Sequence, residues 1–485
     1  MNLTIDNQLI TLRELRRAWL EPVVVDLGDT ARRRIAESNE LIDDVVAHGE
    51  QVYGVNTGFG QLASVRINDD ELAHLQENLV RSHAVGVGED LDDDVVRLIM
   101  LMKVIALAEG FSGVRLELVD GLCDLINHEI YPRIPSRGSV GASGDLAPLA
   151  HLAGALIGIG EVRINGSLAP AAIALKEAGI KPVRLAPKEG LALLNGTQVS
   201  TALALSGVFR TENVLSAALM AGAMSSDAVN GSDTPFDRRI QSVRGHGGQI
   251  AVAAVLRDLM SGSDIRASHT HCDRVQDPYS IRCQPQVMGA CLDVLRHVCK
   301  VLETEANAVT DNPLVFTDSR AVLSGGNFHA EPVALAADYL ALGIAEIGAL
   351  SERRIALLID EHLSGLPAFL VREGGLNSGF MMAQVTAAAL ASENKSHAHP
   401  ASVDSLPTSA NQEDHVSMAT FAARRLHTML DNVADIVAIE LLAGAQGIDF
   451  HRPTRSSPAI EDAMSVIREL SPVYEAVSYT HLRAH

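Results

Sequence analysis

Long stretches of apolar residues at helical spacing constrain the fold of this 485-residue chain more than any other feature. They predict helices over residues 95–107, 287–309, 332–359 and 412–442. Pro332 suits a first helical turn, and Asn411 followed by Asp414 resembles a capping box. Strand-like alternation is scarce outside the N-terminal region, and aromatic residues make up only 4% of the chain, which disfavours a strand-rich fold. The sequence therefore predicts a mainly α fold, a long-helix bundle with a smaller mixed N-terminal region.

The chain shows no internal repeat, low-complexity tract or clear linker, so independent domains are not expected. We divide it into an N-terminal region at 1–195 that carries a glycine-rich loop, a central long-helix bundle at 196–450, a C-terminal segment at 451–476 and a tail at 477–485. The tail, VSYTHLRAH, resembles a translated sequencing-library adapter. We expect it to be non-native and the segment before it to be truncated, with an ordinary polar tail as the alternative.

Charge and cysteine content limit the partners and the compartment. The 39 basic and 60 acidic side chains give a formal net charge of −21, whereas nucleic-acid binding requires a basic surface. The five cysteines form no CxxC pair, and the N-terminus lacks the order of a signal peptide. The uncharged stretches 190–209 and 374–392 contain Asn, Gln, Gly and Ser, so we interpret them as buried helices with loops. We expect a cytoplasmic protein that binds neither nucleic acid nor membranes.

The glycine-rich loop at 138–149, GSVGASGDLAPL, contains the tripeptide Ala142-Ser143-Gly144, which can become an electrophile without an external cofactor. If the amide nitrogen of Gly144 attacks the carbonyl carbon of Ala142 and water is lost, including the Ser143 hydroxyl, the three residues close into a 4-methylidene-imidazol-5-one (MIO) ring. Glycine suits the attacking position because a Cβ would obstruct the approach. Taken alone, the same three residues also fit an ordinary glycine-rich turn before a helix.

The longer string GSVGASGDLAPLAHLAG at 138–154 resembles the signature of the aromatic amino-acid ammonia-lyases and aminomutases. Further matching segments extend from YGVNTGFG at 53–60 to SANQEDHVSM at 409–418. The resemblance implies a homotetramer of fumarase/aspartase-like architecture, with the MIO ring as its prosthetic group, no external cofactor, and active sites completed by loops of more than one subunit. Helices that carry small apolar residues on most faces also favour an oligomer.

The same resemblance assigns roles to residues outside the ring. Tyr53 matches the base that removes the β-proton of the substrate. In QDPYSIRCQPQ at 276–286, Arg282 matches the residue that binds the substrate carboxylate through its planar fork, and Tyr279 and Gln276 match residues that line the ring and the amine. A half-buried tyrosine beside a turn and a surface ion pair of Arg282 are the ordinary alternatives.

Other matched residues concern the ring and the substrate side chain. Asn195 in LLNGTQ resembles the hydrogen-bond donor to the ring, and Phe328 in GGNFHAEP resembles the aromatic residue beside it, with a generic loop Asn and a core Phe as alternatives. His83, after Ser82, and Glu413 match the histidine-specific branch of the family. The alternatives are a satisfied helix histidine and a helix-capping glutamate.

A histidine and a carboxylate make physical sense around an imidazole, which has one donor and one acceptor nitrogen. Burying the carboxylate against a phenyl ring would be costly. The resemblance therefore implies elimination of ammonia from L-histidine to give trans-urocanate, the first step of histidine degradation. A tyrosine or phenylalanine ammonia-lyase, an aminomutase of the same family, and a helical protein that has lost activity are the alternatives.

Signals for other chemistry are weak. The run HTHC at 269–272 could ligate zinc, but no second ligand cluster lies at a suitable spacing, so we expect no metal site. Ser143 does not lie in a G-x-S-x-G elbow because residue 145 is Asp, and no G-K-[ST] phosphate loop is present. These patterns disfavour a hydrolase and a P-loop enzyme.

Overall fold

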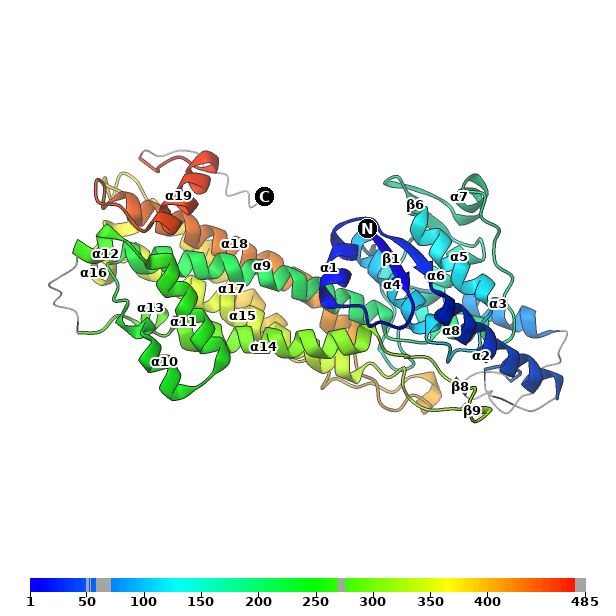
Figure 1. Ribbon diagram of the computed structural model, residues 1–485. Coiled ribbons are helices and arrows are strands. Elements are labelled where there is room, and N and C mark those ends of the chain that lie inside the picture. Colours follow the sequence, from blue (N-terminus) through cyan, green and yellow to red (C-terminus); the bar gives the residue numbers. More distant parts are fainter. Residues whose placement is uncertain (49–51, 53, 58–70, 269–274, 476–485) are drawn as a thin grey trace. The chain divides into compact units, whose positions relative to one another are not determined.

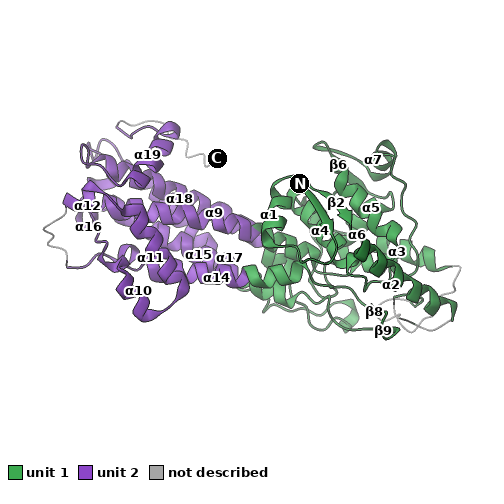
Figure 2. Cartoon of the chain, viewed as in Figure 1, with its two compact units in different colours: residues 1–206, 299–338, 400–424 green, residues 207–298, 339–399, 425–485 purple. Residues whose placement is uncertain are grey.

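The structure, a computed structural model, describes residues 1–48, 52, 54–57, 71–268 and 275–475 (Figure 1). The described chain is mainly helical, which confirms the predicted fold class. It divides into two compact units (Figure 2). Unit 1 comprises Met1–Ser206, Cys299–Asp338 and Pro400–Arg424, and unit 2 comprises Gly207–Val298, Tyr339–His399 and Arg425–His485. Each unit therefore combines segments that are far apart in the sequence.

The long helices lie close to the predicted ranges. They are α4 (Asp93–Ala108), α9 (Gln198–Ala228), α14 (Gln284–Ala306), α15 (Glu331–Ile359) and α18 (Ala419–Asp449). Among the described residues, α15 is long and apolar enough to cross a membrane by length and composition, but 67% of its apolar window is buried inside the protein. The same combination occurs in the core helices of water-soluble proteins.

The predicted start of the fourth helix, at residue 412, is wrong, because α18 begins at Ala419. Residues 409–411 form the 3-10 turn η5 (Ser409–Asn411), and Asn411 has a φ of 67°, a left-handed conformation that cannot begin a helix. The predicted capping box at Asn411 and Asp414 is therefore also wrong. The Ser417 hydroxyl instead accepts a hydrogen bond from Ala419 N at 3.2 Å.

Unit 1 is the mixed part of the molecule. Its shorter helices are α1 (Leu12–Leu20), α2 (Asp29–Ala47), α3 (Leu72–His83), α5 (Leu116–Asn127), α6 (Leu146–Leu156), α7 (Ala171–Glu177) and α8 (Glu189–Leu194). Its strands are β1 (Asn2–Ile5), β2 (Val24–Leu27), β3 (Val87–Asp90), β4 (Tyr131–Pro132), β5 (Pro135–Arg137), β6 (Glu161–Ile164), β7 (Ser167–Pro170), β8 (Leu314–Phe316) and β9 (Ala321–Leu323). Strands β1 and β2 pair in parallel, whereas β3–β5, β4–β6–β7 and β8–β9 are antiparallel. At the centre of the unit, α4 is buried on all faces from Val95 onwards and packs against α1, α2 and α5.

The regular elements of unit 2 among its described residues are all helices, which are joined by loops. Besides parts of the long helices, it contains η3 (Thr234–Phe236), α10 (Arg238–Arg244), α11 (Gly247–Met260), α12 (Asp264–Ser268), α13 (Tyr279–Arg282), α16 (Glu361–Ser364), η4 (Ala368–Leu370), α17 (Met381–His397) and α19 (Pro458–Leu470). Aliphatic residues of α15, α17 and α18, among them Ile355, Ala387 and Ile436, form one cluster of its core.

A fully buried ion pair ties three helices of unit 2 together. Arg354 on α15 contacts Glu440 on α18 through Nε–Oε1 at 2.5 Å and Nη2–Oε2 at 2.8 Å, and neither side chain is exposed. Ser225 on α9 and Ser351 on α15 donate hydrogen bonds to the same carboxylate at 2.7 and 2.5 Å. Four donor contacts thus compensate the desolvation of this carboxylate.

Replacing Glu440 by Gln should leave the Arg354 guanidinium buried without a counter-charge. We expect the free energy of unfolding to fall by about 3–5 kcal/mol, measured by urea unfolding. The matched control is Asp431→Asn, which removes an ion pair with Arg210 in which the Asp431 side chain is 68% exposed, and which should cost less than about 1 kcal/mol. Equal losses in the two variants would contradict the assignment.

Candidate active site

The glycine-rich loop at 138–149 lies against the backbone of residues 195–197. Gly144 forms an isolated parallel bridge with Gly196, and Asp145 N donates to Gly196 O at 2.8 Å. Gly144 has a φ of 74°, and a Cβ on it would collide with the carbonyl oxygen of Gly196. The position therefore requires glycine both for its backbone angle and for the close approach.

Asp145 holds the end of this loop in place. Its side chain is fully buried, and its Oδ2 accepts hydrogen bonds from Ser200 N at 2.8 Å and Ser200 Oγ at 3.0 Å in the first turn of α9. Its Oδ1 accepts from Ser139 Oγ at 2.8 Å and from Thr420 Oγ1 at 2.6 Å in α18. The sequence analysis did not count Asp145 among the site residues, although a charged residue inside a glycine-rich apolar string was a usable signal.

Asn195 and Glu413, two predicted site residues that are far apart in the sequence, both contact Ser143. Asn195 Nδ2 donates to the Ser143 carbonyl oxygen at 3.1 Å, and Ser143 Oγ donates to Glu413 Oε1 at 2.5 Å. Ala142 beside it is buried, whereas Ser143 is half-buried. In the MIO ring the retained carbonyl would be that of Ser143, so the position of the Asn195 amide fits this group.

Glu413 is held as a carboxylate. Burial raises its pKa, but hydrogen bonds from Ser143, from Thr408 Oγ1 at 2.6 Å and from Ser409 Oγ at 2.9 Å, together with the positive charge of His83 when its ring is protonated, outweigh this effect. The net result is a pKa below the ordinary value of a glutamate. The alternative that Glu413 caps a helix is wrong, because α18 begins at Ala419.

His83 and Phe328 lie in unit 1 with the loop. His83 ends α3, and its Nδ1 lies 2.8 Å from Leu79 O. Because a carbonyl oxygen only accepts, Nδ1 carries the proton of the neutral ring and Nε2 is an acceptor. Phe328 is half-buried, two residues before Ala330, whose amide donates to Gly141 O at 3.2 Å.

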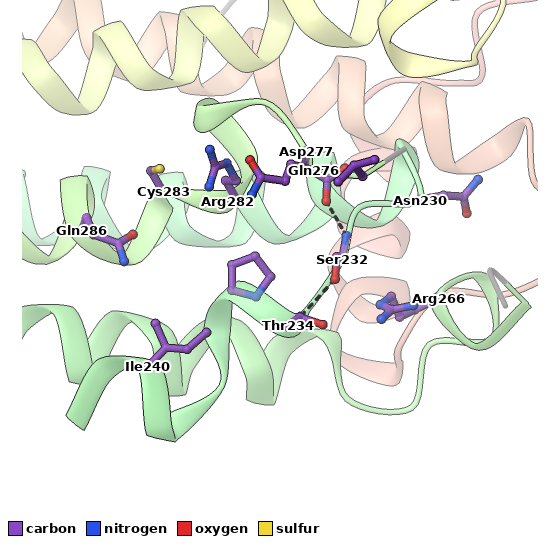
Figure 3. A pocket seen from close by; sticks show the side chains of 12 residues that line it. Asn230, Ser232, Thr234, Ile240, Arg266, Gln276, Asp277, Arg282, Cys283 and Gln286 are labelled. Carbon is purple, nitrogen blue, oxygen red and sulfur yellow. Dashed lines mark hydrogen bonds between the residues drawn. The ribbon is translucent and has the colours of Figure 1, made fainter. Parts of the chain in front are cut away.

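Arg282, Tyr279 and Gln276 form a second group, in unit 2. The guanidinium carbon of Arg282 lies 4.5 Å from the ring centroid of Tyr279, whose side chain is 70% exposed. Arg282 and Gln276 line one pocket together with Asp277 and Gln286 (Figure 3). Arg282 Nε is buried and lacks a hydrogen-bond partner, and in the described part of the chain no acidic side chain pairs with it. A guanidinium in this state can accept a carboxylate ligand.

Three of the sequence interpretations concern residues outside the described part of the chain. They are the base Tyr53, the HTHC run at 269–272 and the tail at 477–485.

The sequence profile of aromatic amino acid lyases matches residues 10–469. The chain belongs to this family. A histidine ammonia-lyase from Vibrio cholerae is 57% identical over 480 residues, which cover 99% of this chain and 94% of that protein. The crystal structure of histidine ammonia-lyase from Trypanosoma cruzi has a TM-score of 0.91 at 44% identity and covers 99% of this chain and 91% of its own.

A tyrosine aminomutase from Streptomyces globisporus resembles the chain equally well in fold, with a TM-score of 0.93 at 36% identity over 99% of this chain and 94% of its own. The fold of the aromatic amino acid lyase family therefore accommodates more than one reaction. Substrate and reaction must be argued from the side chains of the site.

Lys103 is a buried lysine beside the site that the sequence analysis did not identify. It lies on α4, and its Nζ donates to Asn195 O at 2.6 Å and to Ala192 O at 3.2 Å. Burial lowers its pKa to about 7, although the charge of Asp311 opposes this. Lys103 thus satisfies carbonyl groups at the end of α8 and positions the backbone of Asn195. A single lysine inside the apolar run 95–107 was the signal that could have revealed it.

Because the folded pKa of Lys103 lies well below the value of about 10.4 expected for an unfolded chain, the unfolded chain binds more protons between these pH values. Lys103 therefore contributes more to the free energy of unfolding as the pH rises from 7 to 10, so the folded protein becomes more stable relative to a variant that lacks this lysine. Relative to Lys103→Met, we expect the parent to gain at most about 1.4 kcal/mol per pH unit in this range, measured by urea unfolding. Lys300→Met, which removes an exposed lysine of α14, should follow the parent at every pH. A parallel pH dependence of Lys103→Met and the parent would contradict the assignment.

Proposed function

We propose that this chain is a carbon–nitrogen lyase that eliminates ammonia from L-histidine to give trans-urocanate. The observation that carries the proposal is the arrangement at Ser143, where Asn195 contacts the carbonyl group and the Glu413 carboxylate contacts the hydroxyl group. The 57% identity to the Vibrio cholerae histidine ammonia-lyase supports the same substrate. An ionised carboxylate beside the loop suits an imidazole and disfavours the phenyl ring of a phenylalanine substrate.

The prosthetic group we propose is the MIO ring formed from Ala142, Ser143 and Gly144, with no external cofactor. Two observations support this ring. A Cβ at Gly144 would collide with the Gly196 backbone, so the attacking position requires glycine, and Asn195 donates a hydrogen bond to the Ser143 carbonyl oxygen. The ring supplies an electrophilic carbon conjugated with that carbonyl, which helps the substrate amine to leave. By donating to the carbonyl oxygen, Asn195 draws electron density from the conjugated system and strengthens the electrophile.

The remaining residues bind and orient the substrate. Arg282, which has no acidic partner among the described residues, holds the substrate carboxylate through two parallel hydrogen bonds. Glu413 Oε1 accepts a hydrogen bond from an imidazole N–H, because the Ser143 hydroxyl that donates to it is lost when the ring closes. His83, which acts electrostatically on the Glu413 carboxylate, is proposed to border the imidazole-binding part of the site.

Proton removal and the surroundings of the amine are proposed from the family resemblance. Tyr53, acting as the phenolate, takes the β-proton of the substrate on its phenolic oxygen and becomes the neutral phenol. Tyr279 and Gln276 orient the amine, and Phe328 packs beside the ring. By binding the substrate carboxylate, Arg282 keeps the β-carbon in a fixed position while the β-proton is transferred.

We propose that the enzyme acts as a cytoplasmic homotetramer in which a second copy of the chain completes each site. Leu335, Tyr339 and Leu342 on α15 support an oligomer, because they follow one face of the helix and are 56%, 45% and 49% exposed. An apolar stripe of this kind is stabilised by burial against another copy.

Ser143→Ala removes the hydroxyl that leaves during ring closure. We expect urocanate formation to fall to background, and the denatured mass to lack the deficit of two water molecules that the parent shows. Intact-mass spectrometry and a near-ultraviolet assay with L-histidine measure both effects. The control Ser242→Ala removes an exposed hydroxyl of α10 and should keep the mass deficit and the activity. Full turnover in Ser143→Ala would disprove the ring assignment.

Glu413→Gln replaces the acceptor that we assign to the imidazole N–H. A hydrogen bond to a charged group contributes about 1.5–3 kcal/mol, so kcat/KM for L-histidine should fall about 10- to 100-fold while turnover of L-phenylalanine does not fall. Glu393→Gln, which alters an exposed glutamate of α17, is the control and should leave both values unchanged. An equal fall for both substrates would show that Glu413 does not select the imidazole.

A further inference from the structure

Two histidines and a glutamate of unit 1 converge outside the proposed catalytic residues. In the described part of the chain, His329, Glu331 and His415 each bring one potential ligand atom to within 4.8 Å of the others. The two imidazole rings stack with their centroids 5.7 Å apart and an angle of 9° between their planes. His415 Nε2 lies 3.8 Å from Glu331 Oε2. No short sequence motif reveals this group, because His415 follows Glu331 by a long stretch of chain.

Glu331 has an acceptor that the protein leaves unused. Its Oε2 is buried and accepts no hydrogen bond from the described residues. A carboxylate oxygen removed from water requires a hydrogen bond or a cation, since its desolvation otherwise goes uncompensated. A positive ion between this oxygen and the two imidazoles would compensate it.

His329 is already oriented for metal binding. Its Nε2 lies 3.2 Å from His415 O. Because a carbonyl oxygen only accepts, Nε2 carries the proton of the neutral ring, and Nδ1 keeps a lone pair. Donation of one ring nitrogen to a backbone carbonyl is the usual support of a metal-binding histidine, since it sets the tautomer and the ring orientation.

We propose that His329, Glu331 and His415 form a binding site for a divalent transition-metal cation of the Zn²⁺ class. Two imidazole nitrogens and one carboxylate oxygen suit Zn²⁺ with water as the fourth ligand, whereas Mg²⁺ and Ca²⁺ favour sets of oxygen ligands. Metal–ligand bonds of about 2 Å require the three ligand atoms to move closer together. His415, whose side chain is 66% exposed, is free to make this movement.

The site would join two segments that support the ring-forming loop. Ala330, between the two ligands His329 and Glu331, donates through its amide to Gly141 O at 3.2 Å. Three residues after His415, Met418 N donates to Val140 O at 2.8 Å. A cation that links the segments should therefore stabilise unit 1, and this effect does not depend on the proposed ring chemistry.

The test uses the full chain after dialysis against a chelator, titrated with Co²⁺ and then with Zn²⁺. We expect one Co²⁺ per chain with an absorption spectrum of nitrogen and oxygen ligands, displacement by Zn²⁺, and a thermal midpoint that rises with Zn²⁺ concentration. In Glu331→Ala/His415→Ala the affinity should fall at least about 100-fold and the midpoint should no longer respond. His415→Ala alone, at an exposed position, provides the same test if the double variant does not fold.

Two control variants separate this site from other ligands. His397→Ala removes a half-buried histidine that lies 3.4 Å from Glu393 on α17, and it should bind the metal like the parent. His271→Ala/Cys272→Ser removes two of the three potential ligands of the HTHC run at 269–272 and should also retain binding. Loss of binding in that variant, a sulfur charge-transfer band with Co²⁺, or unchanged affinity in His415→Ala would overturn the proposal.

Discussion

The contact between Gly144 and Gly196 is the constraint on which the rest of the site depends. Both residues have positive φ values, 74° and 128°, and a side chain on either would collide with its surroundings. This backbone-on-backbone approach brings the Ser143 carbonyl to the Asn195 amide. The Asp145 carboxylate then ties the loop to two long helices, so a short segment of small residues takes its position from the helical scaffold.

Buried charged residues also hold α8, the helix that leads into the Asn195–Gly196 side of the Gly144–Gly196 contact. The six-residue helix α8, which ends beside Asn195, is held at its start by Glu189, which pairs with Arg115 at 2.8 Å, and at its end by Lys103. Buried charges are costly to desolvate, and removing one partner leaves the other uncompensated. A displaced α8 would therefore lose several charged contacts at once, which restricts Asn195 to one position.

Local patterns in the sequence located elements, but not the contacts between them. Apolar spacing predicted α4, α14 and α15 closely because helical periodicity is a local signal. The start of α18 was misplaced because Met418, in the left-handed region with φ 56°, is held by a hydrogen bond to Val140, a contact distant in sequence. The family motif named Asn195 as a donor to the ring, yet no motif could say that Glu413 contacts the Ser143 hydroxyl. Lys103 and Asp145 belong to no ligand pattern; their only sequence signal was a charge inside an apolar or glycine-rich run, and their burial and hydrogen bonds show what each one holds in place.

The role that we propose for Glu413 would explain how one fold can select an imidazole substrate. Its Oε2 accepts from Thr408 and Ser409, whereas Oε1 accepts from the Ser143 hydroxyl. Under the proposed ring closure that hydroxyl leaves, and Oε1 becomes a half-buried acceptor without its donor. A phenyl ring cannot satisfy it, whereas an imidazole N–H can, and sites built around such an acceptor strongly reject analogues that lack the donor. The reaction that creates the electrophile would thus also create the hydrogen-bonding requirement that selects the substrate.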